Sequence, residues 1–264
     1  MAEFKEHAPG TFCWVDLVTK DAGASKKFYS ELMSWDTVDT PAGPDMVYTM
    51  LQLRGKAVGG LYAMGPEQRS QGLPPHWMSY IAVIDVDGTV EKAKSLGGRV
   101  AMEPADVFEA GRMALIQDPT GAVLAVWQAK EHKGALLKNE PWTICWNELM
   151  TRDEHRAGEF YGKLFGWTAQ AQKMGEGGLY TMFSLDETQV GGMMKIQEEW
   201  GEVPPNWMVY FAVEDCAASV EKVRSLKGEI IVPVTHIPDV GRFAVIEDPQ
   251  SAVFGIVEMK TSDS

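Results

Sequence analysis

The chain has 264 residues, of which 45% are hydrophobic and 10% aromatic, enough for two domains with buried cores. Its 37 aspartate and glutamate residues outnumber 24 lysine and arginine residues, so the formal net charge is -13. Nucleic acids and anionic membranes are bound through clustered positive charge, and neither is therefore an expected partner.

The cysteines and the N-terminus indicate the compartment. Three cysteines without a CxxC spacing do not suggest a disulfide framework or a structural zinc site. The first ten residues, MAEFKEHAPG, lack the basic and apolar regions of a signal peptide. No apolar run approaches the ~20 residues of a membrane helix. We therefore expect a cytoplasmic protein with free, buried thiols.

One stretch occurs twice, first as residues 12–35, FCWVDLVTKDAGASKKFYSELMSW, and again as residues 144–167, ICWNELMTRDEHRAGEFYGKLFGW. Nine of the 24 aligned positions are identical, including Trp14/Trp146, Asp21/Asp153 and the Phe-Tyr pair. A period of 132 residues is too long for a solenoid repeat and suits a whole domain. Two similar halves are therefore expected.

The repeated stretch predicts a strand followed by a helix. Alternation over residues 11–19 places Trp14 and Asp16 on one face of the strand and Cys13 and Val15 on the other. Asp21 is a suitable N-cap for the helix, and Asp153 is its counterpart. The tryptophans that follow the two helices, Trp35 and Trp167, are expected to fill the core.

The rest of each half predicts a hairpin, a second strand and helix, and a final hairpin. Tyr-Thr-Met strands at 48–50 and 180–182 precede Gly-Gly pairs, and a loop follows that is two residues shorter in the second half. Strands at 77–87 and 207–217 lead into helices from Thr89 and Ser219. DPTG and DPQS turns separate the last strands. The pattern β-α-β-β-β thus occurs four times.

The order and spacing of these motifs resemble the vicinal oxygen chelate superfamily, which includes glyoxalase I, bleomycin resistance proteins and extradiol dioxygenases. The resemblance implies an α+β fold of four βαβββ modules, which form two glyoxalase-like domains with curled mixed sheets around clefts. We assign residues 1–129 and 142–264 to the two domains and the charged segment 130–141 to a linker.

Catalytic members of this superfamily hold a divalent metal through His, Gln and Glu ligands on three strands. Counting from the motifs, the corresponding positions are filled by Trp14, Met78 and Ala125 in the first half and by Trp146, Met208 and Gly255 in the second. None of these side chains offers a charged oxygen or an imidazole nitrogen. We therefore expect no metal and no cofactor.

Strand alternation and the resemblance together predict a cleft surface in each half. The expected ligand-binding residues are Trp14, Asp16, Tyr48, Met78, Tyr80, Trp146, Glu148, Tyr180, Met208 and Tyr210. Asp16 and Glu148 are the catalytic candidates, with Arg112 and Arg242 as their expected ion-pair partners. Alternatively, Asp16 or Glu148 could combine with His76 in a displaced metal site.

Three classes of function remain. The first is binding of a small aromatic or apolar molecule without a metal, as in a bleomycin-resistance-like protein. The second is a glyoxalase- or dioxygenase-like enzyme that uses a displaced metal or acid-base chemistry by Asp16 or Glu148. The third is a structural or partner-binding protein with filled clefts. The sequence leaves open whether the chain is an enzyme, which small-molecule ligand it binds and how many chains associate.

Overall fold

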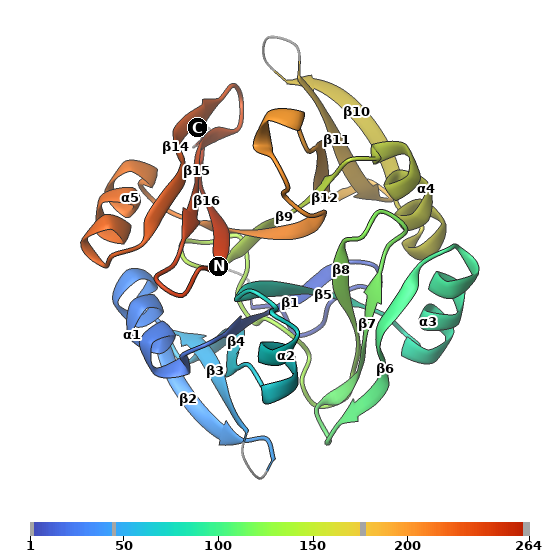
Figure 1. Ribbon diagram of the computed structural model, residues 1–264, viewed down its shortest axis with the longest axis horizontal. Coiled ribbons are helices and arrows are strands. Elements are labelled where there is room, and N and C mark those ends of the chain that lie inside the picture. The colour runs from blue at the N-terminus through green and yellow to red at the C-terminus, as the bar shows by residue number, and fades with distance from the viewer. Residues whose placement is uncertain (1–2, 44–45, 175–177, 261–264) are drawn as a thin grey trace.

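The computed structural model describes residues 3–43, 46–174 and 178–260, and these form two eight-stranded mixed sheets, one from each half (Figure 1). The strand order is β2-β3-β4-β1-β5-β8-β7-β6 in the first sheet and β10-β11-β12-β9-β13-β16-β15-β14 in the second. The predicted α+β fold of paired βαβββ modules is confirmed. Within the described residues, no helix is both long enough and apolar enough to cross a membrane.

The elements follow one another in the predicted order. The first sheet contains β1 (Phe12–Thr19), β2 (Asp36–Pro41), β3 (Val47–Leu53), β4 (Lys56–Ala63), β5 (His76–Ala82), β6 (Arg99–Val107), β7 (Gly111–Gln117) and β8 (Val123–Ala129). The second contains β9 (Ile144–Thr151), β10 (Thr168–Met174), β11 (Gly178–Leu185), β12 (Thr188–Lys195), β13 (Asn206–Ala212), β14 (Glu229–Ile237), β15 (Gly241–Glu247) and β16 (Val253–Met259). The helices are α1 (Ala22–Met33), α2 (Pro66–Ser70), α3 (Val86–Ser95), α4 (Glu154–Phe165), α5 (Cys216–Ser225) and the 3-10 helix η1 (Glu198–Trp200).

Two of the predicted boundaries are wrong. The strands expected at 77–87 and 207–217 end earlier, and their helices begin at Val86 and Cys216. The cause in the second half is Asp215, whose carboxylate accepts hydrogen bonds from the backbone N–H groups of Ala217 and Ala218 and so caps the helix. The predicted cap Asp21 is confirmed by its hydrogen bond from the N–H of Ala24.

The central strands bring distant positions side by side. Asp16 on β1 pairs with Gly60 on β4 and with Met78 on β5, and Tyr80 on β5 pairs with Ala125 on β8. Equivalent pairs join Glu148 to Gly192 and Met208, and Tyr210 to Gly255. Each half therefore assembles the same set of positions on one face of its sheet.

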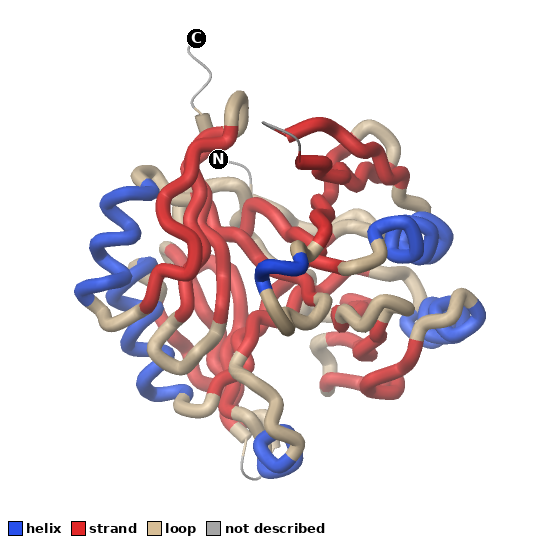
Figure 2. The backbone as a smooth tube through the Cα atoms, turned by 45° about the horizontal axis from the view of Figure 1, so that its top comes forward, coloured by secondary structure: helices blue, strands red, loops and turns tan. Residues whose placement is uncertain are grey.

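The two halves share a core. Helix α1 packs beside α5, and α3 beside α4, so each helix pair contains one helix from each half (Figures 1 and 2). Trp35 and Trp167 are 2% and 4% exposed, which confirms their prediction as core residues. Phe211 of the second half lies 5.5 Å from the ring of Trp35 and 5.1 Å from that of Trp77.

A buried hydrogen-bond network also crosses between the halves. The indole of Trp207 donates to the hydroxyl of Tyr161 at 2.8 Å, and this hydroxyl donates to the carboxylate of Asp118 at 2.8 Å. The matching network joins Trp77 and Tyr29 of the first half to the Asp of the second DP turn. The Phe-Tyr helix motif and the DP turn therefore connect the two halves.

The domain limits 1–129 and 142–264 and the linker 130–141 remain predictions.

Candidate functional site

The first cluster, defined as Trp14, Asp16, Tyr48, Met78 and Tyr80, is centred on a buried carboxylate. Asp16 is 4% exposed, and its Oδ1 accepts hydrogen bonds from the Trp14 indole at 2.9 Å and the Tyr48 hydroxyl at 2.6 Å. Its Oδ2 accepts one from Tyr80 at 2.7 Å. The structure thus brings the predicted residues of the first half together.

The second cluster, defined as Trp146, Glu148, Tyr180, Met208 and Tyr210, repeats this arrangement with a longer acid. Glu148 is 7% exposed and accepts a hydrogen bond from the Tyr210 hydroxyl at 3.0 Å. The Trp146 indole donates to the Tyr180 hydroxyl at 2.8 Å instead of to the acid. Both clusters therefore hold a carboxylate among aromatic donors.

A glycine on the strand next to each acid leaves room for a tyrosine ring to reach it. A Cβ atom at Gly60 would collide with the Tyr48 hydroxyl and with Asp16 Oδ1, and one at Gly192 would collide with the Tyr180 hydroxyl. Only glycine leaves this space free, since every other residue carries a Cβ. The second residue of each Gly-Gly pair is therefore required by the cluster.

The pKa values of the two buried carboxyl groups are raised. Burial raises the pKa of the Asp16 carboxyl, and hydrogen bonds from Tyr48, Tyr80 and Trp14 partly oppose this effect. Burial likewise raises the pKa of Glu148, against hydrogen bonds from Tyr180 and Tyr210. Each acid therefore holds a proton at a higher pH than an exposed carboxyl would.

The predicted arginine partners of these acids are wrong. Arg112 pairs with Asp87 at 2.7 Å and with Asp106 at 3.4 Å, on the surface. Arg242 pairs with Glu258 at 2.6 Å. These acids lie at the surface, on a neighbouring strand or at the start of a helix, within reach of the arginines. Pairing with Asp16 or Glu148 would instead require a guanidinium to be buried in the sheet interior, where it would lose its hydration. Among the described residues, neither Asp16 nor Glu148 forms an ion pair.

His76 has a local role. Its Nδ1 lies 2.8 Å from the carbonyl oxygen of Pro74, and Asn206 makes the equivalent contact by donating to the Pro204 carbonyl at 2.9 Å. Both side chains thus stabilise the entry into a strand. In the described part of the chain, no group of three or more His, Cys, Asp and Glu residues could hold a metal ion.

Three further aromatic residues extend the first cluster. Tyr62 stacks on Tyr48 with centroids 6.5 Å apart, and Trp127 meets the Tyr80 ring edge-on at 6.4 Å. His132, from the predicted linker, lies edge-on to Trp14 at 4.4 Å. Alternation from Gly60 and Ala125 could have identified the first two, because they lie two residues further along the same strands. No sequence signal places the linker histidine here.

Burial keeps two histidines of this region neutral. It lowers the pKa of His132 to about 4, with a smaller contribution from His7, and it lowers the pKa of His7 to about 4, with a contribution from Lys138. Within the described residues, the buried Nε2 atom of His132 has no hydrogen-bond partner. Packing, and not a hydrogen bond of that atom, therefore holds the ring.

These histidines predict a loss of stability in acid. The unfolded chain binds protons to His132 below about pH 6.5, whereas the folded protein does so only below about pH 4. Above pH 6.5 the neutral His132 does not lower the free energy of unfolding. As the pH falls to 4, the free energy of unfolding declines by up to ~3 kcal/mol, at ~1.4 kcal/mol per pKa unit. The melting temperature should therefore drop more between pH 7 and 4.5 in the native protein than in His132→Phe.

The comparison between these two proteins isolates His132 from the carboxyl groups that titrate in the same range. The raised pKa values of Asp16 and Glu148 act in the opposite direction, since their burial favours the folded state at low pH. Equal drops in melting temperature for the native protein and His132→Phe would contradict the prediction.

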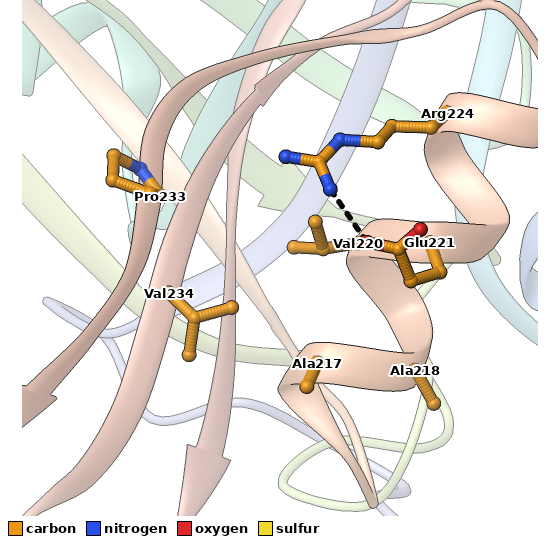
Figure 3. A pocket seen from close by; sticks show the side chains of 7 residues that line it. All are labelled: Ala217, Ala218, Val220, Glu221, Arg224, Pro233 and Val234. Atoms are coloured by element: carbon orange, nitrogen blue, oxygen red, sulfur yellow. Dashed lines mark hydrogen bonds and ion pairs between the residues drawn. The ribbon is translucent and has the colours of Figure 1, made fainter.

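Two surface pockets lie apart from the acids. One, of about 460 Å³, lies between α5 and β14, where Arg224 pairs with Glu221 (Figure 3). The other, of about 330 Å³, lies beside the N-terminal arm and includes His7, Trp127 and Lys133. Neither pocket is lined by Asp16 or Glu148, so neither coincides with the predicted clefts.

The three cysteines are free, as predicted. Burial raises the pKa of the Cys13 and Cys145 thiols to about 12, which keeps them protonated. Their sulfur atoms lie 3.5 Å and 3.4 Å from the carbonyl oxygens of Tyr80 and Tyr210. Cys13 is therefore an unreactive core group, whereas Cys145 is protonated but only partly buried.

Comparison with known proteins gives matches over the whole chain. A sequence model described as the Glyoxalase/Bleomycin resistance protein/Dioxygenase superfamily matches residues 11–126 and 127–254. A Mycobacterium tuberculosis protein named "Putative glyoxylase CFP32" is 42% identical over 259 residues, 98% of each chain. "Anthracycline biosynthesis protein DnrV" of Streptomyces peucetius is 34% identical over 266 residues, 96% of this chain and 94% of that one.

Solved structures share the fold at low sequence identity. The Mn(II)-bound glyoxalase from Novosphingobium aromaticivorans has a TM-score of 0.65 and 16% identity, over 97% of this chain and 86% of that one. The 2,3-dioxygenase LapB from Pseudomonas sp. KL28 has a TM-score of 0.65 and 9% identity, over 100% and 95% of the chains. At these identities the likeness concerns the fold alone.

Proposed function

The chain belongs to the glyoxalase/bleomycin resistance protein/dioxygenase superfamily, and from this premise we propose that it binds a small planar aromatic molecule without a divalent metal ion. The observation that carries the proposal is a buried carboxylate, Asp16 or Glu148, surrounded by aromatic rings and lacking a cation from the described chain. Such a surface suits a flat apolar ligand that presents a protonated amine or a hydroxyl group.

The donor set supports binding without a metal. Both oxygens of Asp16 already accept hydrogen bonds, and the neighbouring positions hold Trp14, Met78 and Ala125, which are poor ligands for a hard divalent ion. The second half offers Trp146, Met208 and Gly255 at the same places. A metal ion does not fit these residues, and no step of the proposed function depends on one.

A relative's name supports the aromatic class. The protein of Streptomyces peucetius that is 34% identical to this chain is named for anthracycline biosynthesis. Anthracyclines contain fused, planar aromatic rings, which match the shape of a surface made of indole and phenol rings. An anthracycline is therefore a suitable first probe for this chain.

An enzyme of acid-base type is the second candidate. Burial raises the pKa of Glu148, and a carboxyl with a raised pKa is suited to proton transfer. Glu148→Gln preserves the shape of the side chain but removes the titrating group. Loss of turnover in this variant, with retained ligand binding, would favour the enzyme over the binding protein.

Calorimetric titration with doxorubicin, a planar anthracycline with a protonated amine, tests the proposal. We expect binding that EDTA does not change, and a loss of affinity of at least ~tenfold in the double variant Trp14→Ala/Trp146→Ala, since each lost ring contact contributes ~0.5–1.5 kcal/mol. Ile231→Ala, at a position 52% exposed, should keep the native affinity.

Two outcomes would reject the proposal. The first is unchanged affinity in the double tryptophan variant, because the ligand would then lie elsewhere. The second is binding that disappears with EDTA and returns with a divalent ion. Anthraquinone-2-sulfonate provides the charge control, since its planar rings carry a negative group and it should bind more weakly beside a buried carboxylate.

A further inference from the structure

The two clusters differ in how completely they are covered. All eight residues of β1 are buried, whereas Cys145, Trp146 and Met150 of the matching strand β9 are partly exposed. Trp14 is 3% exposed, while its counterpart Trp146 keeps part of its surface accessible. The two strands pair in the same register and are identical at four of their eight positions, and residues from neighbouring parts of the chain add to the difference.

Trp127 is the first of these parts. It lies beside Ala82 in the parallel pairing of β5 and β8, and the equivalent position beside Ala212 holds Val257. Its ring is 5% exposed and meets the rings of Tyr80 and His132. The first half therefore has an indole where the second half has only an isopropyl group.

His132 is the second part. The backbone places it, because its N–H donates to the Ala110 carbonyl and its carbonyl accepts from the Trp127 indole at 3.0 Å. Its ring then lies edge-on to Trp14 at 4.4 Å. Among the described residues, no aromatic ring contacts Trp146 in this way. Trp127 and His132 together are here called the plug.

A smaller difference adds to the effect of the plug. Tyr62, beside Val18 on β4, stacks on Tyr48, whereas Met194 occupies the equivalent place beside Met150. Val18 is 1% exposed, while Met150 is partly exposed on the same face as Glu148.

We propose that the plug closes the first cluster, so that only the second cluster, around Trp146 and Glu148, is open to a small planar aromatic ligand. The identity of the ligand class rests on the proposed function, whereas the closure of the first cluster does not. The first half then serves as a closed structural copy. Glu148 is the carboxylate that faces the amine or hydroxyl group of the ligand, and Asp16 is satisfied by its three hydrogen bonds.

Thiol labelling tests the closure without any ligand. Val18→Cys and Met150→Cys place a thiol at equivalent positions of the two clusters, each in a Cys145→Ser background, and monobromobimane is the probe. We expect Met150→Cys to react at least ~tenfold faster, since a buried group reacts only through local opening and ~1.4 kcal/mol of opening free energy corresponds to tenfold. Equal rates, or a faster Val18→Cys, would overturn the proposal.

Replacing the plug tests its role directly. Trp127→Val/His132→Gly gives the first cluster the valine of the second half and removes the linker ring, and Val18→Cys in this background should react as fast as Met150→Cys. If the cysteine at position 18 still reacts slowly in a variant that retains the native circular dichroism spectrum, the plug does not close the first cluster. If this variant does not fold, the comparison of the two single cysteine variants still decides the proposal.

Doxorubicin titration separates this proposal from the proposed function. One molecule per chain, lost in Trp146→Ala and retained in Trp14→Ala, supports both. Two molecules per chain, or loss of binding in Trp14→Ala alone, would overturn the single open site while leaving aromatic binding intact. Absence of binding would overturn the proposed ligand class, and the labelling rates would then decide the closure alone.

Discussion

Phe211→Ala is expected to destabilise the protein by ~3–5 kcal/mol, the usual effect of truncating a buried phenylalanine in a core that cannot collapse. Phe211 is fully buried, and its ring contacts Trp35 and Trp77 from the other half and Phe254 from its own. Truncation would leave a cavity between two rigid indoles. The variant should therefore lose stability in both halves at once.

Urea unfolding followed by tryptophan fluorescence and by circular dichroism measures this effect. We expect the two signals to coincide in a single transition, because the halves share one core. Phe108→Ala is the matched control, since this phenylalanine is 70% exposed and its loss should change stability by less than ~0.5 kcal/mol. A variant that unfolds in two separate steps, or with native stability, would show that the halves are energetically independent.

Asp118→Ala is expected to cost ~3–5 kcal/mol, because it removes a buried acceptor and leaves its donors unsatisfied. The carboxylate is 3% exposed and accepts from the N–H groups of Thr120, Gly121 and Ala122 and from the Tyr161 hydroxyl of the other half. Alanine would release the DP turn and also leave the Tyr161 hydroxyl buried without an acceptor.

A double-mutant cycle isolates the link between the halves. Tyr161→Phe alone should cost ~1.5–3 kcal/mol, since it removes a hydrogen bond to a charged group and the acceptor of the Trp207 indole. The costs of Asp118→Ala and Tyr161→Phe should not add, because both break the same bond. Asp87→Ala, at a surface ion pair, is the control and should have little effect. Additive costs would show that the bond contributes nothing across the halves.

The sequence predicted most of the candidate site because strand alternation is a local property. Trp14, Asp16 and Tyr80 follow from a period of two residues along single strands, and the structure brings them together through pairings that the repeated modules imply. The hydrogen-bond donors to Asp16 were not predicted from this alternation. Arg112 was expected, but tyrosine and tryptophan donors satisfy the acid, since they reach it without burying a second charge.

The amino-acid sequence by itself determined the four βαβββ modules, the helix caps at Asp21 and Asp153, and the faces that carry Asp16 and Glu148, because these depend on neighbours a few residues away. Only the tertiary structure decided that Tyr161 reaches Asp118 across the halves and that His132 covers Trp14. These contacts join residues far apart in the chain. No local pattern encodes them, since they arise from the packing of complete sheets and helices.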